Sequence, residues 1–431
     1  MMKRFCLVLL IIVSLALAAC QPVATEPAGD MSMEAAEPSG TVEVFSWWSG
    51  GGELAGLNAI IEVFNARYPD VEFDNAAIGG GDGVNMKTVL ETRMLGGEPP
   101  DSFQVWAGVG VVEDHVVPGR MEGLDFLFSE EGLYDVFPQS VIDNVSYEGT
   151  PYVVPVNIHR QNIMWYRLDR FEAAGITEPP ANWDEFFVVA EQLKEAGIPA
   201  IGGASLGALA FHTYNYFLNS VTDGETYLGL FDGSVGWDAP EVAEALALHM
   251  RAMEYASGDW LEVGWGDQVE RFAADYDETP AIILMGDWFW GFIKSEGIEE
   301  LVGWADIPDH QGKYVWVADS FGLPKNAPNR DNAIAWLKVV ASKDGQDAFN
   351  PLKGSIPVRT DGDVSLYDEY LRESMDAWQT HELLPFIGGL VRQSFVTDLG
   401  NIVNNMLTGH GDVARAQEEL IQAAKDSGIG E

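Results

Sequence analysis

Aromatic and polar side chains occur together where the predicted strands of this sequence end. A sugar has apolar C–H faces, on which aromatic rings stack, and a rim of hydroxyls, which charged and amide groups bind. Because the carboxyl ends of strands in a doubly wound sheet line a ligand crevice, we expect these side chains to converge there. The residues with this placement are Trp47, Trp48, Glu53, Gln104, Trp106, Asn157, His159, Asp287, Trp288 and Asp319.

Each of these residues also has an ordinary structural interpretation. Adjacent strand residues point to opposite faces of a sheet, so one of Trp47 and Trp48 is expected to pack in the core while the other lines the crevice. His159 could equally be a core histidine with its hydrogen bonds satisfied. Packing alone, however, does not require successive strands to end in a tryptophan plus a polar residue.

The acidic members of this set leave a hydrolase open as an alternative. A glycosidase needs two carboxyl groups placed across the scissile bond. Glu53, Asp287 and Asp319 each follow a predicted strand and are the candidates, but their spacing does not single out an acid and a nucleophile.

The glycine run that follows the two tryptophans fits a second alternative. The stretch "GGGELA" at 50–55 matches the dinucleotide pattern G-x-G-x-x-A between a strand and a helix. Against this reading, Trp47 and Trp48 stand where backbone would have to approach a pyrophosphate closely. We expect no cofactor. We also expect no metal, because the seven histidines are scattered and no H-E-x-x-H motif occurs.

Strand and helix patterns alternate along most of the chain. Strands are predicted at 42–48, 71–78, 102–106 and 280–285, and helices at 332–341, 365–378, 395–407 and 412–426. Alternation of this kind predicts a parallel sheet covered by helices on both faces. The fold class is therefore α/β, with two lobes of similar size.

The N-terminus and the net charge indicate where the protein works. Lys3 and Arg4 precede an apolar run at 5–19, which predicts a signal peptide at 1–19. The ending "LALAAC" resembles the bacterial lipobox, which implies a lipid on Cys20 and a disordered tether over 20–40; the alternative is an ordinary cleavage site. The net charge of −43 disfavours nucleic acid as a partner. We expect an extracytoplasmic protein that meets the membrane through its lipid anchor alone.

Several long segments resemble one protein family. They are "FSWWSGGGE", "TRMLGGEPPDSFQVWAG", "VPVNIHRQNIMWY", "MGDW" and the stretch "DSFGLPKNAPNRDNAIAWLKVVASKDGQDAFNPLKGSIP". Together they resemble extracellular solute-binding proteins of bacterial ABC sugar importers, of the glucose or hexose type. The resemblance implies a two-lobe periplasmic-binding-protein (Venus flytrap) fold with a hinge and three chain crossings. The crossings are expected near Pro155, Asp306 and Gly354, with lobe one at 41–154 plus 306–354 and lobe two at 155–305 plus 355–431.

The resemblance also implies roles for individual residues. Gln104, His159, Asp319 and Lys353 match polar contacts to the sugar hydroxyls, Trp265 and Trp288 match stacking platforms, and Trp47, Trp48 and Glu53 match the first loop at the cleft. Such relatives commonly have His where this chain has Trp106, and His in the segment around Phe386 and Ile387. These departures replace hydroxyl partners by apolar surface, which favours a different hexose or a larger sugar.

The activity that the resemblance implies is capture without chemistry. We expect a monomer that is not an enzyme and that hands a mono- or oligosaccharide to the permease of an ABC transporter. The alternatives are a surface glycoside hydrolase that uses acids in the same cleft, and a tethered partner that binds sugar in order to signal.

Overall fold

The computed structural model describes residues 37–80, 83–202, 210–258, 260, 265–274, 279–310 and 312–430, with 265–267 described by their backbone alone. The residues from Pro38 onward form one unit. Within it the strands fall into three larger sheets and one short hairpin of β4 (Ser146–Tyr147) and β5 (Thr150–Pro151).

The first sheet has five strands in the order β2-β1-β3-β12-β6. Strand β1 runs parallel to both β2 and β3, as the sequence predicts, but β12 runs antiparallel to β3 and to β6. The prediction of an all-parallel sheet is thus wrong for β12, which enters the sheet directly from a strand of another sheet instead of through a crossover helix. The strands are β1 (Gly40–Ser46), β2 (Val71–Ala77), β3 (Ser102–Trp106), β6 (Val153–Pro155) and β12 (Asp319–Gly322).

Two three-stranded sheets make up the rest. One has the order β10-β8-β9 and is antiparallel throughout, and the other, β13-β11-β7, is mixed. The strands are β7 (His159–Arg160), β8 (Ile163–Arg167), β9 (Ile282–Leu284), β10 (Val302–Asp306), β11 (Lys313–Val317) and β13 (Glu382–Pro385).

The chain passes between the five-stranded sheet and the β13-β11-β7 sheet over very short segments. Residues 156–158 join β6 to β7, and Ala318 alone joins β11 to β12. Ile158 also forms an antiparallel bridge with Ile356. Because β11 pairs with strands of predicted lobe two, we propose that the second crossing lies at Ala318 instead of near Asp306; the lobe bounds remain a proposal.

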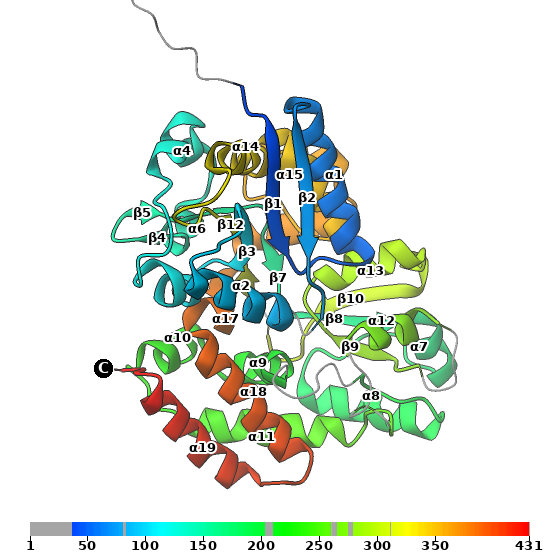
Figure 1. The fold of residues 1–431 in the computed structure, drawn as a ribbon. Helices are drawn as coiled ribbons and strands as arrows, with labels where there is room; N and C mark the ends of the chain where they lie inside the picture. The colour runs from blue at the N-terminus through cyan, green and yellow to red at the C-terminus, as the bar shows by residue number, and fades with distance from the viewer. Residues whose placement is uncertain are drawn as a thin grey trace, which may run out of the picture. The chain divides into compact units, whose positions relative to one another are not determined.

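The C-terminal helices lie close to where the sequence predicts them. The predicted segment 365–378 divides into a 3₁₀ turn (Val364–Leu366) and α16 (Glu369–Thr380), because the Asp368 side chain caps α16 by accepting from Leu371 N at 3.0 Å. In the lower part of Figure 1 four helices pack together. They are α9 (Ala210–Val221), α11 (Pro240–Met253), α18 (Gln393–Leu407) and α19 (Val413–Asp426).

The remaining helices surround the sheets; α14 contacts β1, and α1 lies beside β2 in Figure 1. Among the helices within the described ranges, none has both the length and the apolarity to cross a bilayer. The bounds are α1 (Gly51–Arg67), α2 (Val84–Gly96), α3 (Val109–Val111), α4 (Asp125–Glu130), α5 (Leu133–Val136), α6 (Gln139–Asn144), α7 (Leu168–Ala174), α8 (Trp183–Glu195), α10 (Gly224–Asp232), α12 (Trp265–Ala273), α13 (Trp288–Glu296), α14 (Arg330–Ala341), α15 (Lys343–Lys353) and α17 (Ile387–Leu390).

Trp336 of α14 anchors the core beneath the five-stranded sheet. Its ring is fully buried, with centroid distances of 4.9 Å to Phe73 and 5.2 Å to Phe321. Edge-to-face contacts of this kind add to the free energy that burial of the rings provides.

We predict that Trp336→Ala lowers the free energy of unfolding by about 3–5 kcal/mol, because it leaves a large cavity in this core. Urea denaturation followed by circular dichroism measures the change. Leu95→Ala is the control, since Leu95 is 66% exposed. Equal urea midpoints for Trp336→Ala and Leu95→Ala would contradict the role of Trp336 as an anchor of this core.

Candidate functional site

The Asp319 carboxylate is the centre of the site. Asp319 begins β12, opposite Trp106 at the end of β3, and is 3% exposed. Its Oδ1 accepts from Gln104 Nε2 at 3.1 Å, and its Oδ2 accepts from Asn157 Nδ2 at 3.0 Å. Asn157 Oδ1 in turn accepts from the Asp319 backbone N–H at 2.8 Å. Amides from β3 and from the segment just past β6, on the two sides of β12, therefore hold this carboxylate in one orientation.

His159 connects Asp319 to a second buried carboxylate. Its Nδ1 contacts Asp287 Oδ1, and Asp287 Oδ2 accepts from the Arg160 backbone N–H at 2.9 Å. His159 Nε2 lies 3.5 Å from Asp319 Oδ2. Asp287 is fully buried behind the imidazole. It therefore sets the orientation of His159.

A lysine and a glutamate complete the row of charges. Lys353, the last residue of α15, is 1% exposed, and its Nζ lies 3.2 Å from Glu53 Oε1. Glu53 is in the first turn of α1, where the helix dipole favours a negative charge. Charges of alternating sign thus run from Asp287 through His159, Asp319 and Lys353 to Glu53.

This alternation shifts the pKa values of the central pair. Burial and the Lys353 ammonium lower the pKa of His159, but Asp287 and Asp319 outweigh them, so the pKa is raised. For Asp319, burial raises the pKa, but hydrogen bonding to His159 and the charge of Lys353 outweigh it, so the pKa is lowered. Both groups are consequently held in their charged forms.

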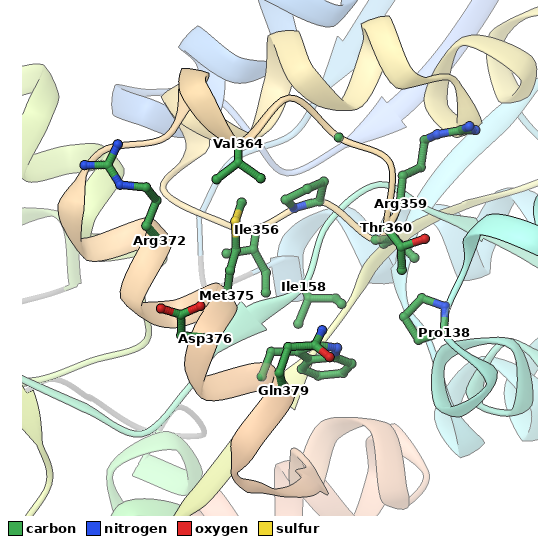
Figure 2. Close-up of a pocket in the computed structure, with 14 residues that line it drawn as sticks. Pro138, Ile158, Ile356, Arg359, Thr360, Val364, Arg372, Met375, Asp376 and Gln379 are labelled. Atoms are coloured by element: carbon green, nitrogen blue, oxygen red, sulfur yellow. The ribbon is translucent and has the colours of Figure 1, made fainter.

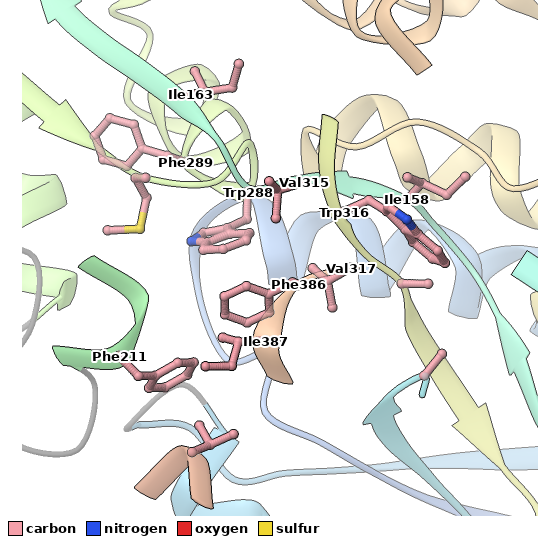
Figure 3. Close-up of a cluster of buried hydrophobic side chains, with 14 of the residues drawn as sticks. Ile158, Ile163, Phe211, Trp288, Phe289, Val315, Trp316, Val317, Phe386 and Ile387 are labelled. Atoms are coloured by element: carbon pink, nitrogen blue, oxygen red, sulfur yellow. The ribbon is translucent and has the colours of Figure 1, made fainter. Parts of the chain in front are cut away.

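Aromatic rings form a wall beside the charges. The Trp106 ring contacts Trp47, His212 and Phe386 edge-on, with centroid distances of 6.0, 6.0 and 5.8 Å. The Trp288 ring stands perpendicular to the His159 imidazole at 5.5 Å. Trp288 and Phe386 belong to one buried cluster (Figure 3), and both rings contact His212, at centroid distances of 5.8 and 5.0 Å.

The two adjacent tryptophans have different surroundings. Both lie just past β1, which ends at Ser46. Trp48 is fully buried in the core against Phe321 and Phe349, at 5.7 and 4.9 Å. Trp47 instead turns toward Trp106, and its backbone N–H donates to Gln104 Oε1 at 3.1 Å. Of the two, Trp47 is the one that belongs to the aromatic wall.

Most residues that the sequence analysis selected are therefore brought together. The side chain of Trp265 lies outside the described residues, although its backbone begins α12. Sequence reasoning missed His212 and Lys87. His212 is in the middle of α9, where no strand-end pattern marks it, and Lys87 Nζ lies 3.7 Å from the Trp106 ring centroid.

The glycines of "SGGGE" serve close packing of the chain on itself. A Cβ on Gly52 would lie 2.6 Å from the Gly291 backbone, and one on Gly51 would lie 2.2 Å from the Phe292 ring. The N-terminus of α1 is therefore packed against α13. This contact explains Gly51 and Gly52 without a pyrophosphate, which disfavours the dinucleotide alternative.

A separate pocket lies beside the bridge between Ile158 and Ile356. It has a volume of about 330 Å³ and is shown in Figure 2. Ile158, Ile356, Met375 and Trp378 line it, and none of the predicted site residues does. Within the described ranges, moreover, no three His, Cys, Asp or Glu side chains are grouped as a metal ion requires.

Comparison with known proteins decides the family. The model of the bacterial extracellular solute-binding protein family matches residues 48–347. The chain belongs to this family. An uncharacterised ABC transporter extracellular-binding protein of Pyrococcus horikoshii is 32% identical, over 89% of this chain and 87% of its own. The xylose/arabinose-binding protein of Haloferax volcanii is 26% identical, over 80% of this chain and 75% of its own.

Solved structures support the fold. A chitin oligosaccharide binding protein superimposes with a TM-score of 0.79 at 20% identity, covering 91% of this chain and all of its own. The maltose-bound MalE3 of T. maritima superimposes with a TM-score of 0.74 at 19% identity, covering 90% of this chain and 100% of its own. The two-lobe α/β fold expected from the sequence is confirmed. The matched family and the relatives of 32% and 26% identity are extracellular or sugar-binding solute receptors by name, which supports a non-enzymatic, extracytoplasmic role.

We predict that His159 makes the stability of the protein depend on pH above neutrality. Its folded-state pKa is raised, so its contribution is complete below the unfolded value of about 6.5 and is lost as the pH rises through the folded value. The pKa of each of His115, His249 and His310 is lowered by burial. These three histidines therefore affect the stability of the protein only at acidic pH and not in the window where His159 does.

Thermal melts between about pH 6 and pH 9 test this prediction. The melting temperature of the wild type should fall more steeply across that window than that of His159→Gln. The exposed His410→Gln is the control and should follow the wild type. Parallel curves for wild type and His159→Gln would show that the imidazole does not carry this linkage.

Proposed function

We propose that this protein captures an uncharged mono- or oligosaccharide outside the cytoplasm and delivers it to the permease of an ABC transporter. The observation that carries the proposal is the row of buried, oriented charges beside an aromatic wall. Relatives named as sugar-binding proteins support it, among them the xylose/arabinose-binding protein and a probable sugar-binding periplasmic protein of Rhizobium meliloti, 26% identical over 77% of this chain.

The proposed contacts follow from the chemistry of the two surfaces. Hydroxyls both donate and accept, so they suit a row in which carboxylates alternate with an imidazolium and an ammonium. In the proposed complex Asp319, Lys353 and Glu53 bind the rim of the sugar. Trp47, Trp106 and Trp288 cover its apolar faces.

The charge balance favours an uncharged ligand. The row contains three carboxylates and, with His159 protonated, two cations, within a chain of net charge −43. An added carboxylate or phosphate would be repelled by this excess of negative charge.

Glycoside hydrolysis is less well supported by the same residues. Its general acid needs a raised pKa, whereas the pKa of Asp319 is lowered by His159 and Lys353. Asp287 is fully buried and directed at His159 and Arg160, and Glu53 is paired with Lys353. The arrangement favours the charged form of Asp319, whereas a glycosidase needs a protonated carboxyl group to give a proton to the leaving group.

The anchoring of the protein is a further part of the proposal. The lipobox-like "LALAAC" supports cleavage before Cys20 and lipidation of its thiol, with 20–40 as a tether. Several acyl chains anchor a protein stably, whereas one chain gives marginal binding. A tethered receptor remains close to the permease that it supplies.

We predict that a sugar stabilises the protein. A ligand at 100 times its dissociation constant raises the free energy of unfolding by about 2.7 kcal/mol. A thermal-shift panel of D-xylose, L-arabinose, D-glucose, D-galactose, maltose and chitobiose measures this effect. No shift with any sugar would count against capture, and growth of reducing ends during incubation would favour the hydrolase.

We predict that Asp319→Asn weakens binding of the sugar that gives the largest shift by tenfold or more, about 1.4 kcal/mol. The substitution keeps the shape of the side chain but removes the charge that Gln104 and Asn157 orient. Trp288→Ala should weaken binding as well, through loss of stacking. Isothermal titration measures both, with Asp331→Asn as the control because its side chain is 90% exposed. Unchanged affinity of both variants for the sugar would refute the assignment of Asp319 and Trp288 to the binding site.

We predict that Cys20→Ser releases the protein from the membrane, because the thiol is the proposed point of lipid attachment. Metabolic labelling with a palmitate analogue, followed by fractionation, measures the change in a bacterial host. Gln21→Ser is the matched control. Unaltered labelling of Cys20→Ser would refute lipidation at this cysteine.

A further inference from the structure

Two backbone segments on opposite sides of the aromatic wall touch each other through glycines. One segment, 106–110, follows β3 of the five-stranded sheet, and the other, 386–391, follows β13 of a different sheet. A Cβ on Gly108 would lie 2.1 Å from the Gly389 carbonyl oxygen, and one on Gly389 would lie 2.9 Å from the Ala107 carbonyl oxygen. Any side chain at either position would separate the segments.

The same contact holds Trp106 in place. A Cβ on Gly388 would lie 2.8 Å from the Trp106 ring, which packs edge-on against Phe386 from the same segment. Gly110 completes the contact, since its Cβ would lie 3.3 Å from the Val391 carbonyl oxygen. The glycines thus leave room for the large ring between the two segments.

Two side-chain hydrogen bonds accompany this contact. Arg392 Nη2 donates to Glu113 Oε2 at 2.6 Å, and Lys87 Nζ donates to Gln393 Oε1 at 3.3 Å. Lys87 is in α2, which precedes β3 in the sequence, and Glu113 is in the turn at 112–116, which follows it. Their partners Arg392 and Gln393 are both at the N-terminal end of α18. Glu113 and Arg392 are 29% and 53% exposed, so their pair contributes little to the stability of the fold.

We propose that Gly108, Gly110, Gly388 and Gly389 form a seam that closes the site and sets its affinity by clamping Trp106 against Phe386. The inference rests on the proposed capture function. In a protein that closes around its ligand, contacts that are made better in the closed form than in the open form shift the equilibrium toward the closed form, with or without the ligand. These glycines are positioning residues, which act on the ligand through Trp106.

Gly389→Ala is the sharpest test. Gly389 does not have a positive φ, so alanine is compatible with its backbone, and the added methyl group meets only the opposite segment. Gly96→Ala is the matched control, because its Cβ would meet no atom within 4 Å. Gly108 is unsuitable, since its φ of 120° strains any other residue.

Isothermal titration with D-xylose, D-glucose and maltose measures the effect. We expect Gly389→Ala to raise the dissociation constant of the tightest-binding of these sugars by about tenfold, because the added methyl group overpacks a close contact. The melting temperature of this variant without sugar should stay near that of the wild type. Arg392→Ala should lower the affinity for the same sugar by less than Gly389→Ala does, and Gly96→Ala should leave it unchanged. Equal affinities for Gly389→Ala and the wild type would overturn the proposal.

Amide hydrogen exchange separates failure of the seam from failure of the function. Without sugar, Gly389→Ala should speed exchange at 107–112 and 387–391, and Gly96→Ala should not. If no sugar binds the wild type but this difference appears, the seam stands and the capture function fails. Identical exchange in the three proteins would refute the seam whatever the ligand is.

Discussion

The structure of the site depends on how one buried anion, the Asp319 carboxylate, is compensated. Burying an ionised carboxylate is costly unless hydrogen bonds and opposite charge offset the loss of water. Here the compensation comes from three separate segments, since Gln104 lies within β3, Asn157 and His159 lie in the stretch from β6 to β7, and Lys353 ends α15. The charge therefore ties the ends of strands from two sheets to one point.

That compensation also prepares the site for a ligand. Asp287 fixes His159 from behind, and Glu53 is paired with Lys353 from the first turn of α1, so the polar groups are oriented before any sugar arrives. A preoriented group loses less conformational entropy on binding than a mobile one, and affinity benefits accordingly. The aromatic wall adds apolar area next to these groups without competing for their hydrogen bonds.

Much of this arrangement was predictable from the sequence because strand ends are easy to recognise. Strand patterns placed Gln104, Trp106 and Asp319 near the ends of strands. Asp319 reaches the same edge as Trp106 for a reason other than the expected one, because it is the first residue of a strand that runs antiparallel to β3. The roles of Asp287 and Trp48 were not predictable, because side-chain direction just past a strand is set by tertiary packing. His212 was missed for a related reason, since a helix interior gives no signal of what its side chain faces. The antiparallel entry of β12 followed from the single-residue link at Ala318, which no periodicity reveals.

Glycine has the same physical role on two sides of this site. Gly51 and Gly52 let α1 pack against α13, and there Glu53 reaches Lys353. Gly108 and Gly389 let two further segments meet beside Trp106. In both places the absence of a side chain brings backbone close to backbone, and a large or charged residue nearby is held in position as a result. A glycine pattern read alone suggested phosphate binding; beside tryptophans and buried charges it indicates close contact between parts of the chain.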